Sequence, residues 1–189
     1  CTLEEKNQLE SHVLLYAGAL TDVKGVDFLL EVFGELHRSE PALKLRLCGE
    51  GPHEQQLRER SRALGLEDCV TFEGYVETRT LKRRMLEAKL LVLPSRTEGF
   101  GRVLVEGLAT FTPFVASQTG GPSEIARKSN GGRLAGDSAE EWEETIVELI
   151  GDQETRRRMG RSGRTYAENR FSTDAYVENY HRLVDRVRE

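Results

Sequence analysis

The chain has 189 residues, of which 38% are hydrophobic and 31% charged, and its net charge is −5. These values describe one ordinary globular domain, and the negative charge disfavours a basic surface for nucleic acid. The polar stretch Thr2–Ser11 is unlike a secretory signal, and no apolar run approaches the roughly 20 residues of a membrane span. Cys1, Cys48 and Cys69 lack paired spacing, so we expect a reducing, cytoplasmic compartment and no zinc site.

Strand-like and helix-like patterns alternate along the chain. The apolar run His12–Gly18 predicts a buried strand, and Val26–Leu36 then places apolar residues at helical spacing. Further strands are expected at Lys44–Gly49, Cys69–Gly74, Lys89–Ser95, Pro113–Ser117 and Gly132–Ala135. Helices are expected from about His53 to Gly65, at Leu81–Ala88 and Gly101–Ala109, after Gly120–Pro122, and in two or three segments near the C-terminus.

This alternation predicts a doubly wound α/β fold, with a parallel β-sheet of about six strands and helices on both faces. Such domains bind ligands at the carboxyl ends of their strands. The search for a site therefore narrows to the loops Gly18–Gly25, Gly49–His53, Gly74–Glu77, Ser95–Gly101 and Ser117–Ser123.

The loop Thr97–Gly101 leaves a predicted buried strand and enters a predicted helix. Its two glycines let the backbone approach a ligand, and the amides of Phe100 to Val103 then suit a phosphate group. Helical side chains lean toward the N-terminus, so Glu106 can reach back toward the loop that holds Glu98. On spacing alone, an equal alternative is that Glu98 complements the helix dipole and Glu106 is a solvated residue.

Lys24 ends a second loop of interest, at the carboxyl edge of the first predicted strand, where a lysine suits an anionic ligand. Read alone, a plain surface lysine is the simpler interpretation. The loop Gly49–Pro52 lacks the third glycine of a dinucleotide fingerprint. No P-loop, HExxH, GxSxG or Asp-x-Asp motif occurs, and the histidines have no metal-ligand spacing.

Motifs along nearly the whole chain are similar to those of one enzyme family. Glu98 and Glu106 lie in PSRTEGFG and the helix after it, preceded by Lys-Gly and GxGP segments and followed by GG-x-x-E. The chain thus resembles the carboxyl-terminal domain of a GT-B-fold retaining glycosyltransferase of family 4, or glycosyl transferases group 1. The matching segments are 17–25 (AGALTDVKG), 45–52 (LRLCGEGP), 70–76 (VTFEGYV), 93–109 (LPSRTEGFGRVLVEGLA), 113–117 (PFVAS), 120–125 (GGPSEI) and 170–172 (RFS).

The resemblance implies a site for a nucleotide-sugar donor and assigns a role to each matching position. Lys24, beside Gly18, would contact the donor diphosphate, and Glu106 would hold the ribose hydroxyls. Glu98 would contact the transferred sugar near its reacting carbon, as the catalytic residue. The backbone at Val76 would meet the base. Phosphate or sugar would lie against the loop and helix start formed by Gly99, Phe100, Gly101 and Val103.

The implied reaction is transfer of a hexose-type sugar with retention of configuration. It would depend on stabilising the departing diphosphate, with no cofactor and no metal. Two residues depart from the family. Ala19 stands where an arginine is usual, so one diphosphate cation is missing unless Arg96 or Arg102 replaces it. Phe111 stands where a glycine is usual, which predicts an altered turn.

The resemblance covers one half of a two-domain enzyme. We therefore expect a single donor-binding domain: a lead-in at 1–11, a Rossmann-like core at 12–170, and a terminal helix at 171–189 that crosses to an acceptor-binding N-terminal domain or partner subunit. Membrane contact would be peripheral, and no nucleic acid is expected. The alternatives are a degenerate, non-catalytic GT-B-like binding or regulatory module and, less well supported, a hydrolase that uses Glu98 and Glu106 as paired carboxylates.

Overall fold

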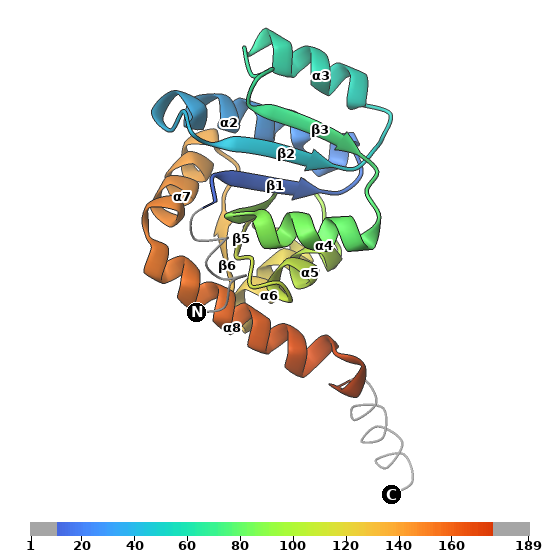
Figure 1. The fold of residues 1–189 in the computed structure, drawn as a ribbon, viewed down its shortest axis with the longest axis vertical. Helices are drawn as coiled ribbons and strands as arrows, with labels where there is room; N and C mark the ends of the chain where they lie inside the picture. Colours follow the sequence, from blue (N-terminus) through green and yellow to red (C-terminus); the bar gives the residue numbers. More distant parts are fainter. Residues whose placement is uncertain (1–10, 176–189) are drawn as a thin grey trace, which may run out of the picture.

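The computed structural model of the chain describes residues 11–175. Its centre is one six-stranded sheet in which every strand pairs with its neighbours in parallel, in the order β3-β2-β1-β4-β5-β6 (Figure 1). The strands are β1 (Val13–Ala17), β2 (Lys44–Cys48), β3 (Val70–Gly74), β4 (Leu90–Leu93), β5 (Phe114–Ser117) and β6 (Gly132–Ala135). All six predicted strands are thus confirmed.

Helices connect the strands and follow the last one. They are the 3-10 helix η1 (Asp22–Lys24), α2 (Val26–Ser39), α3 (Glu54–Ala63), α4 (Thr78–Glu87), α5 (Arg102–Leu108), α6 (Gly120–Ser129), α7 (Ala139–Gly151) and α8 (Gln153–Phe171). The side chain of Ser138 caps α7 by accepting a hydrogen bond from the backbone amide of Glu141.

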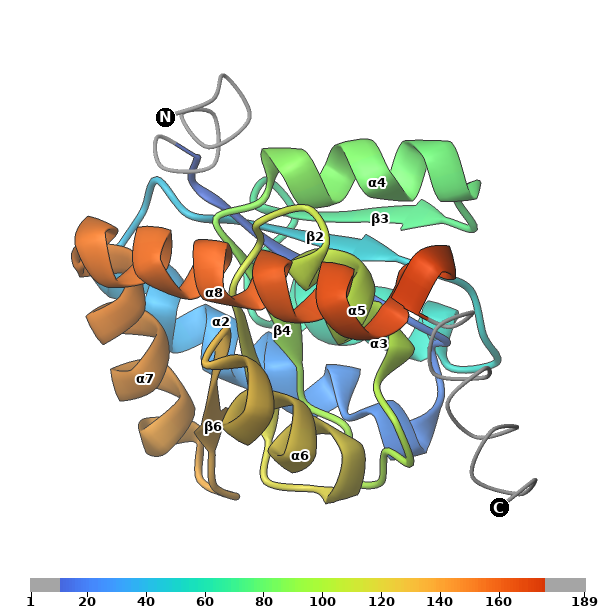
Figure 2. The ribbon, with the colours of Figure 1, turned by 90° about the horizontal axis from the view of Figure 1, so that it is seen from below.

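The strand order places the helices on both faces of the sheet. From β1 to β3 the chain moves toward one edge of the sheet, and from β4 to β6 toward the other. Right-handed crossovers therefore put α2 and α3 on one face of the sheet and α5 and α6 on the other face. The last two helices complete the layers, since α7 packs on α2, and α8 lies across α5 and α6 (Figure 2). This is the predicted doubly wound α/β fold.

The core lies between the central strands and these helices. Leu14, Leu15, Val92 and Phe114 are completely buried. Because helices cover both faces, the central strands read as unbroken apolar runs rather than alternating ones, which is why the sequence predicted them. The predicted lead-in and the predicted terminal helix lie largely outside the described residues. No helix between residues 11 and 175 is long and apolar enough to cross a membrane.

Candidate functional site

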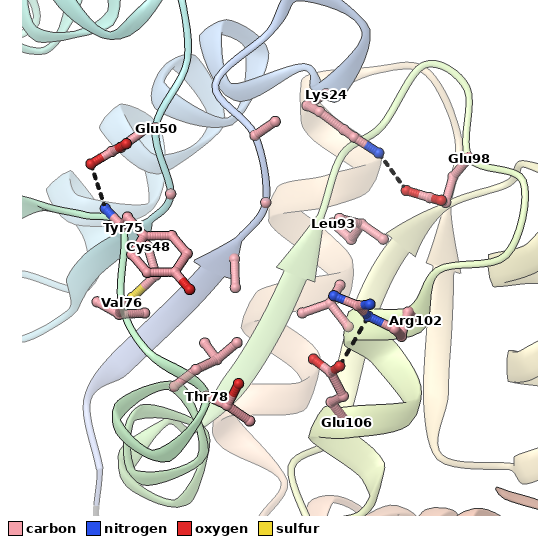
Figure 3. A pocket seen from close by; sticks show the side chains of 16 residues that line it. Lys24, Cys48, Glu50, Tyr75, Val76, Thr78, Leu93, Glu98, Arg102 and Glu106 are labelled. Carbon is pink, nitrogen blue, oxygen red and sulfur yellow. Dashed lines mark hydrogen bonds and ion pairs between the residues drawn. The ribbon is translucent and has the colours of Figure 1, made fainter.

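A pocket of about 600 Å³ lies at the carboxyl ends of the central strands (Figure 3). The chain leaves β1 and β4 toward opposite edges of the sheet, so their following loops diverge and leave an opening between them. The pocket is lined by Ala17, Gly18, Ala19, Lys24, Cys48, Gly49, Glu50, Tyr75, Val76, Thr78, Leu81, Leu93, Glu98, Arg102, Val103 and Glu106.

An ion pair joins the loop after β1 to the loop after β4 at one end of this pocket (Figure 3). Nζ of Lys24 lies 2.6 Å from Oε2 of Glu98, and the two side chains are 23% and 17% exposed. The backbone permits this approach because Gly25 has a φ of 65°, and a Cβ there would lie 2.2 Å from the carbonyl oxygen of Pro94. Lys24 is therefore a positioned pocket residue rather than a plain surface lysine.

Glu98 is held from two sides. Its Oε1 atom accepts a hydrogen bond from the backbone amide of Gly101, at 3.2 Å. Partial burial by itself raises the pKa of the Glu98 carboxyl, but the hydrogen bond and charge of Lys24, with the amides of Gly101 and Phe100, hold that pKa below its ordinary value. Glu98 is thus a carboxylate at neutral pH, fixed in the pocket.

A second ion pair lies along α5. Nε of Arg102 is 3.1 Å from Oε1 of Glu106, and these side chains are 85% and 40% exposed. Glu106 and Glu98 line the same pocket, as the backward lean of helical side chains predicted. The 40% exposure of Glu106 also agrees with the alternative interpretation, in which Glu106 is a solvated residue and Glu98 complements the helix dipole.

The opposite side of the pocket comes from the loops after β2 and β3 (Figure 3). Oε1 of Glu50 accepts a hydrogen bond from the backbone amide of Tyr75, at 3.2 Å. Tyr75 is 72% exposed, and Val76 follows it on the pocket wall. Beneath them, burial and then the nearby Glu73 raise the pKa of the Cys48 thiol to about 12, so that this thiol is uncharged at neutral pH.

The structure brings six of the nine predicted site residues into the pocket. These are Gly18, Lys24, Val76, Glu98, Val103 and Glu106. Gly99, Phe100 and Gly101 are not among the lining residues. The ring of Phe100 lies 5.7 Å from that of Phe171, and the Gly101 amide bonds to Glu98. Their role in holding phosphate or sugar stays a prediction.

Sequence reasoning missed the wall made by Cys48, Glu50, Tyr75 and Thr78. The rule that ligands bind after the strands selects the loops of Glu50 and Tyr75 but identifies no side chain within them, and it leaves out Cys48, the last residue of β2, and Thr78, the first of α4. Arg102 had been named only as one of two cations that would compensate for Ala19. The other, Arg96, points elsewhere: its guanidinium pairs with Asp27 at 2.8 Å, and it does not line the pocket.

The turn after α5 differs from the expectation for Phe111. Phe111 has a φ of 61°, in the left-handed region that favours glycine. Its backbone amide bonds to the carbonyl of Leu108, and that of Thr112 to Gly107. The predicted change of turn is therefore wrong, because phenylalanine adopts the left-handed conformation in spite of the steric strain on its Cβ.

Among the described residues, no three His, Cys, Asp or Glu side chains come together as metal ligands would. The pocket instead presents two cationic and three anionic side chains. Lys24 and Arg102 supply the positive charges, and Glu50, Glu98 and Glu106 the negative ones. Such a site suits a ligand with both an anionic group and hydroxyl groups.

A doubly wound sheet with a charged pocket at its switch point is the architecture of the Rossmann-like half of a GT-B fold. A family model described as glycosyl transferases group 1 matches residues 3–166. The chain belongs to this family of glycosyltransferases.

One relative is similar to the chain in sequence, and two solved structures are similar to it in fold. A D-inositol 3-phosphate glycosyltransferase of Segniliparus rotundus is 32% identical over 171 residues, which cover 88% of this chain and 38% of the relative. A sucrose-phosphate synthase of Thermosynechococcus elongatus has a TM-score of 0.85 at 24% identity, over 98% of this chain and 49% of its own. HepE of Anabaena, solved with UDP and glucose, has a TM-score of 0.83 at 22% identity, over 98% of this chain and 53% of its own. The chain thus spans about half or less of the proteins that it matches.

Proposed function

We propose that this chain is the donor-binding domain of a retaining glycosyltransferase, which holds a nucleoside diphosphate sugar while a hexose-type sugar passes to an acceptor. One observation carries the proposal: Lys24, Glu98 and Glu106 line one pocket at the switch point of the sheet. The UDP and glucose with which HepE of Anabaena was solved support a donor of this chemical class.

Each charged group has a task in this proposal. Lys24 stabilises the negative charge that grows on the diphosphate as the bond to the sugar breaks. Glu106 accepts hydrogen bonds from the ribose hydroxyls. Glu98 lies beside Lys24, 2.6 Å away, and faces the sugar, where its negative charge stabilises the positive charge that develops at the reacting carbon.

The base lies against the opposite wall, at the backbone of Val76. That wall lies across the pocket from Lys24 (Figure 3). A nucleotide laid across it would thus place its base and its phosphates against chemically different surfaces. The uncharged thiol of Cys48 and the side chain of Val76 suit an apolar ring.

The proposal includes a partner for the open side of the pocket. The acceptor site lies in an N-terminal domain or a separate subunit, because the chain spans 38% of one relative and 49% of one structural neighbour. We place the protein in the cytoplasm, where the free thiols Cys48 and Cys69 remain reduced, with membrane contact only peripheral.

Calorimetric titration of the purified chain with UDP, GDP, ADP and their sugar conjugates tests the donor site. We expect one nucleotide to bind selectively, with affinity lost in Lys24→Ala and Glu106→Ala and kept in the exposed control Lys82→Ala. EDTA is expected to leave binding unchanged, because the proposal assigns no task to a metal. If no nucleotide binds, even when the acceptor half is added, the domain is the non-catalytic binding module that the loss of a cation at Ala19 first suggested.

Retention is a separate part of the proposal and needs the full-length enzyme. The anomeric configuration of the product, read from its proton coupling constants, is expected to equal that of the donor. An inverted product would contradict the retaining mechanism and leave the donor-binding role intact.

A further inference from the structure

The acidic side chains of the pocket neutralise its positive charges. Both basic side chains that line it are ion-paired with acidic ones that also line it: Lys24 with Glu98, and Arg102 with Glu106. A diphosphate that enters must therefore compete with a carboxylate for either cation. The two ion pairs differ in how easily an entering anion can separate them.

The Lys24 pair is the more firmly held of the two. Its side chains are only 23% and 17% exposed, and the Gly101 amide holds Glu98 in place as well. Opening this pair would leave two partly buried charges without their partner. We therefore expect Lys24 to remain paired with Glu98 when Lys24 contacts an anion.

The Arg102 pair is the more easily opened. Arg102 and Glu106 are one helical turn apart on α5, and the arginine is 85% exposed. An exposed pair at this spacing shifts an equilibrium by only about twofold. The contact uses Nε of Arg102, and within residues 11–175 no second hydrogen-bond partner of this guanidinium is recorded. A diphosphate can accept two hydrogen bonds from the guanidinium of Arg102, which makes it a better partner than one carboxylate oxygen.

We propose that Arg102 is the second cation for the donor diphosphate and that it exchanges Glu106 for this anion on binding. The exchange does two things at once. It supplies the positive charge that Ala19 cannot provide, and it releases Glu106 to accept hydrogen bonds from the ribose. This inference rests on the proposed donor-binding function and identifies a specificity residue within the same pocket.

The exchange makes a prediction that simple charge attraction does not. A nucleoside has a ribose and no phosphate, so it needs Glu106 but gains nothing from Arg102. Removing Arg102 should therefore weaken binding of a nucleoside diphosphate and leave binding of the nucleoside unchanged or slightly stronger. The two ligands separate the role of Arg102 as a cation from its role in restraining Glu106.

The test uses uridine, guanosine and adenosine, each beside its 5′-diphosphate, titrated into the 189-residue chain. Binding is followed by NMR chemical-shift changes, which also measure weak nucleoside affinity. The variants are Arg102→Gln and the charge-keeping Arg102→Lys. The matched control is Arg83→Gln, which removes an exposed arginine from a similar pair with Glu87, 3.6 Å apart on α4 and outside the pocket.

For the base that binds, Arg102→Gln should weaken the diphosphate about tenfold, the usual size of a charge-assisted contact. Arg102→Lys should weaken it less, and the nucleoside should bind as before or about twofold more tightly. Arg83→Gln should change neither. Unchanged diphosphate binding in Arg102→Gln would overturn the inference, and so would an equal loss for both ligands, which indicates a structural role.

The failure of the proposed function would look different. In that case the unaltered chain would bind none of the diphosphates, and this inference would fall with it. Diphosphate binding by the unaltered chain, unaffected by Arg102→Gln, would refute the exchange alone.

Discussion

The Lys24–Glu98 pair allows a prediction about stability that is independent of any ligand. Lys24→Met keeps an apolar stem of similar length and removes the ammonium group that lies 2.6 Å from Glu98. Glu98 then keeps the hydrogen bond from the Gly101 amide, at 3.2 Å, and the nearby amide of Phe100. A partly buried carboxylate loses its counter-charge, and the folded state is destabilised.

The burial of the pair sets the magnitude. Fully exposed pairs contribute at most about 1 kcal/mol, whereas removing one partner of a fully buried pair costs about 3–5 kcal/mol. Exposures of 23% and 17% place this pair between those limits. We therefore expect Lys24→Met to lower the free energy of unfolding by about 2 kcal/mol at neutral pH.

The effect depends on pH with a defined sign. The folded-state pKa of Glu98 lies below its ordinary value. The pair's contribution is thus fully present above the unfolded pKa of about 4.3 and is lost as the pH falls through the folded-state value. In Lys24→Met the pKa of Glu98 should rise, and this part of the pH dependence should shrink.

Urea denaturation of the unaltered chain, Lys24→Met, Glu98→Gln and the double variant measures the coupling directly. We expect a coupling energy of about 1–2 kcal/mol at pH 7 that declines as the pH is lowered. A coupling below about 0.5 kcal/mol, the value of an exposed pair, would refute the claim that the fold positions these two groups together.

Three further predictions concern single residues. Gly25→Ala should destabilise the fold by well over the roughly 1–2 kcal/mol of left-handed strain, because a Cβ there meets the carbonyl of Pro94. The control is Gly65→Ala, at a φ of 72° with open space around the Cβ, which should show that strain alone in the same urea assay. Ser138→Ala should remove the α7 cap and lower stability by about 1 kcal/mol, measured by thermal unfolding. Cys48, with a thiol pKa of about 12, should resist iodoacetamide at pH 8 until urea is added, as peptide mapping would show.

Local patterns predicted the features that depend on local physics. The central strands were evident because helices cover both faces, so Leu90–Leu93 carries no polar alternation. Glu98 and Glu106 were expected to share one pocket because the direction of helical side chains is fixed by the backbone.

What the sequence did not predict depends on distant partners. Lys24 and Glu98 are 74 residues apart, so their pairing follows from the strand order and not from any local pattern. The sequence leaves Arg96 and Arg102 as equal candidates for the compensating cation, whereas the structure places Asp27, in the first turn of α2, beside Arg96. Phe111 was misjudged because the packing around a turn can impose a φ of 61° on a residue whose intrinsic preference opposes it.

The strand order also has a consequence for the folding of the chain. β1 joins the two halves of the sheet only by pairing with β4, through Leu14 with Leu90 and Leu15 with Leu91. Such long-range closure is slow compared with formation of the helices and neighbouring strand pairs. A chain in which only β1 to β3 had assembled would carry Lys24 without Glu98 or the whole of α5. The charged pocket therefore forms only after β1 and β4 have joined the two halves of the sheet, and its appearance would report that step.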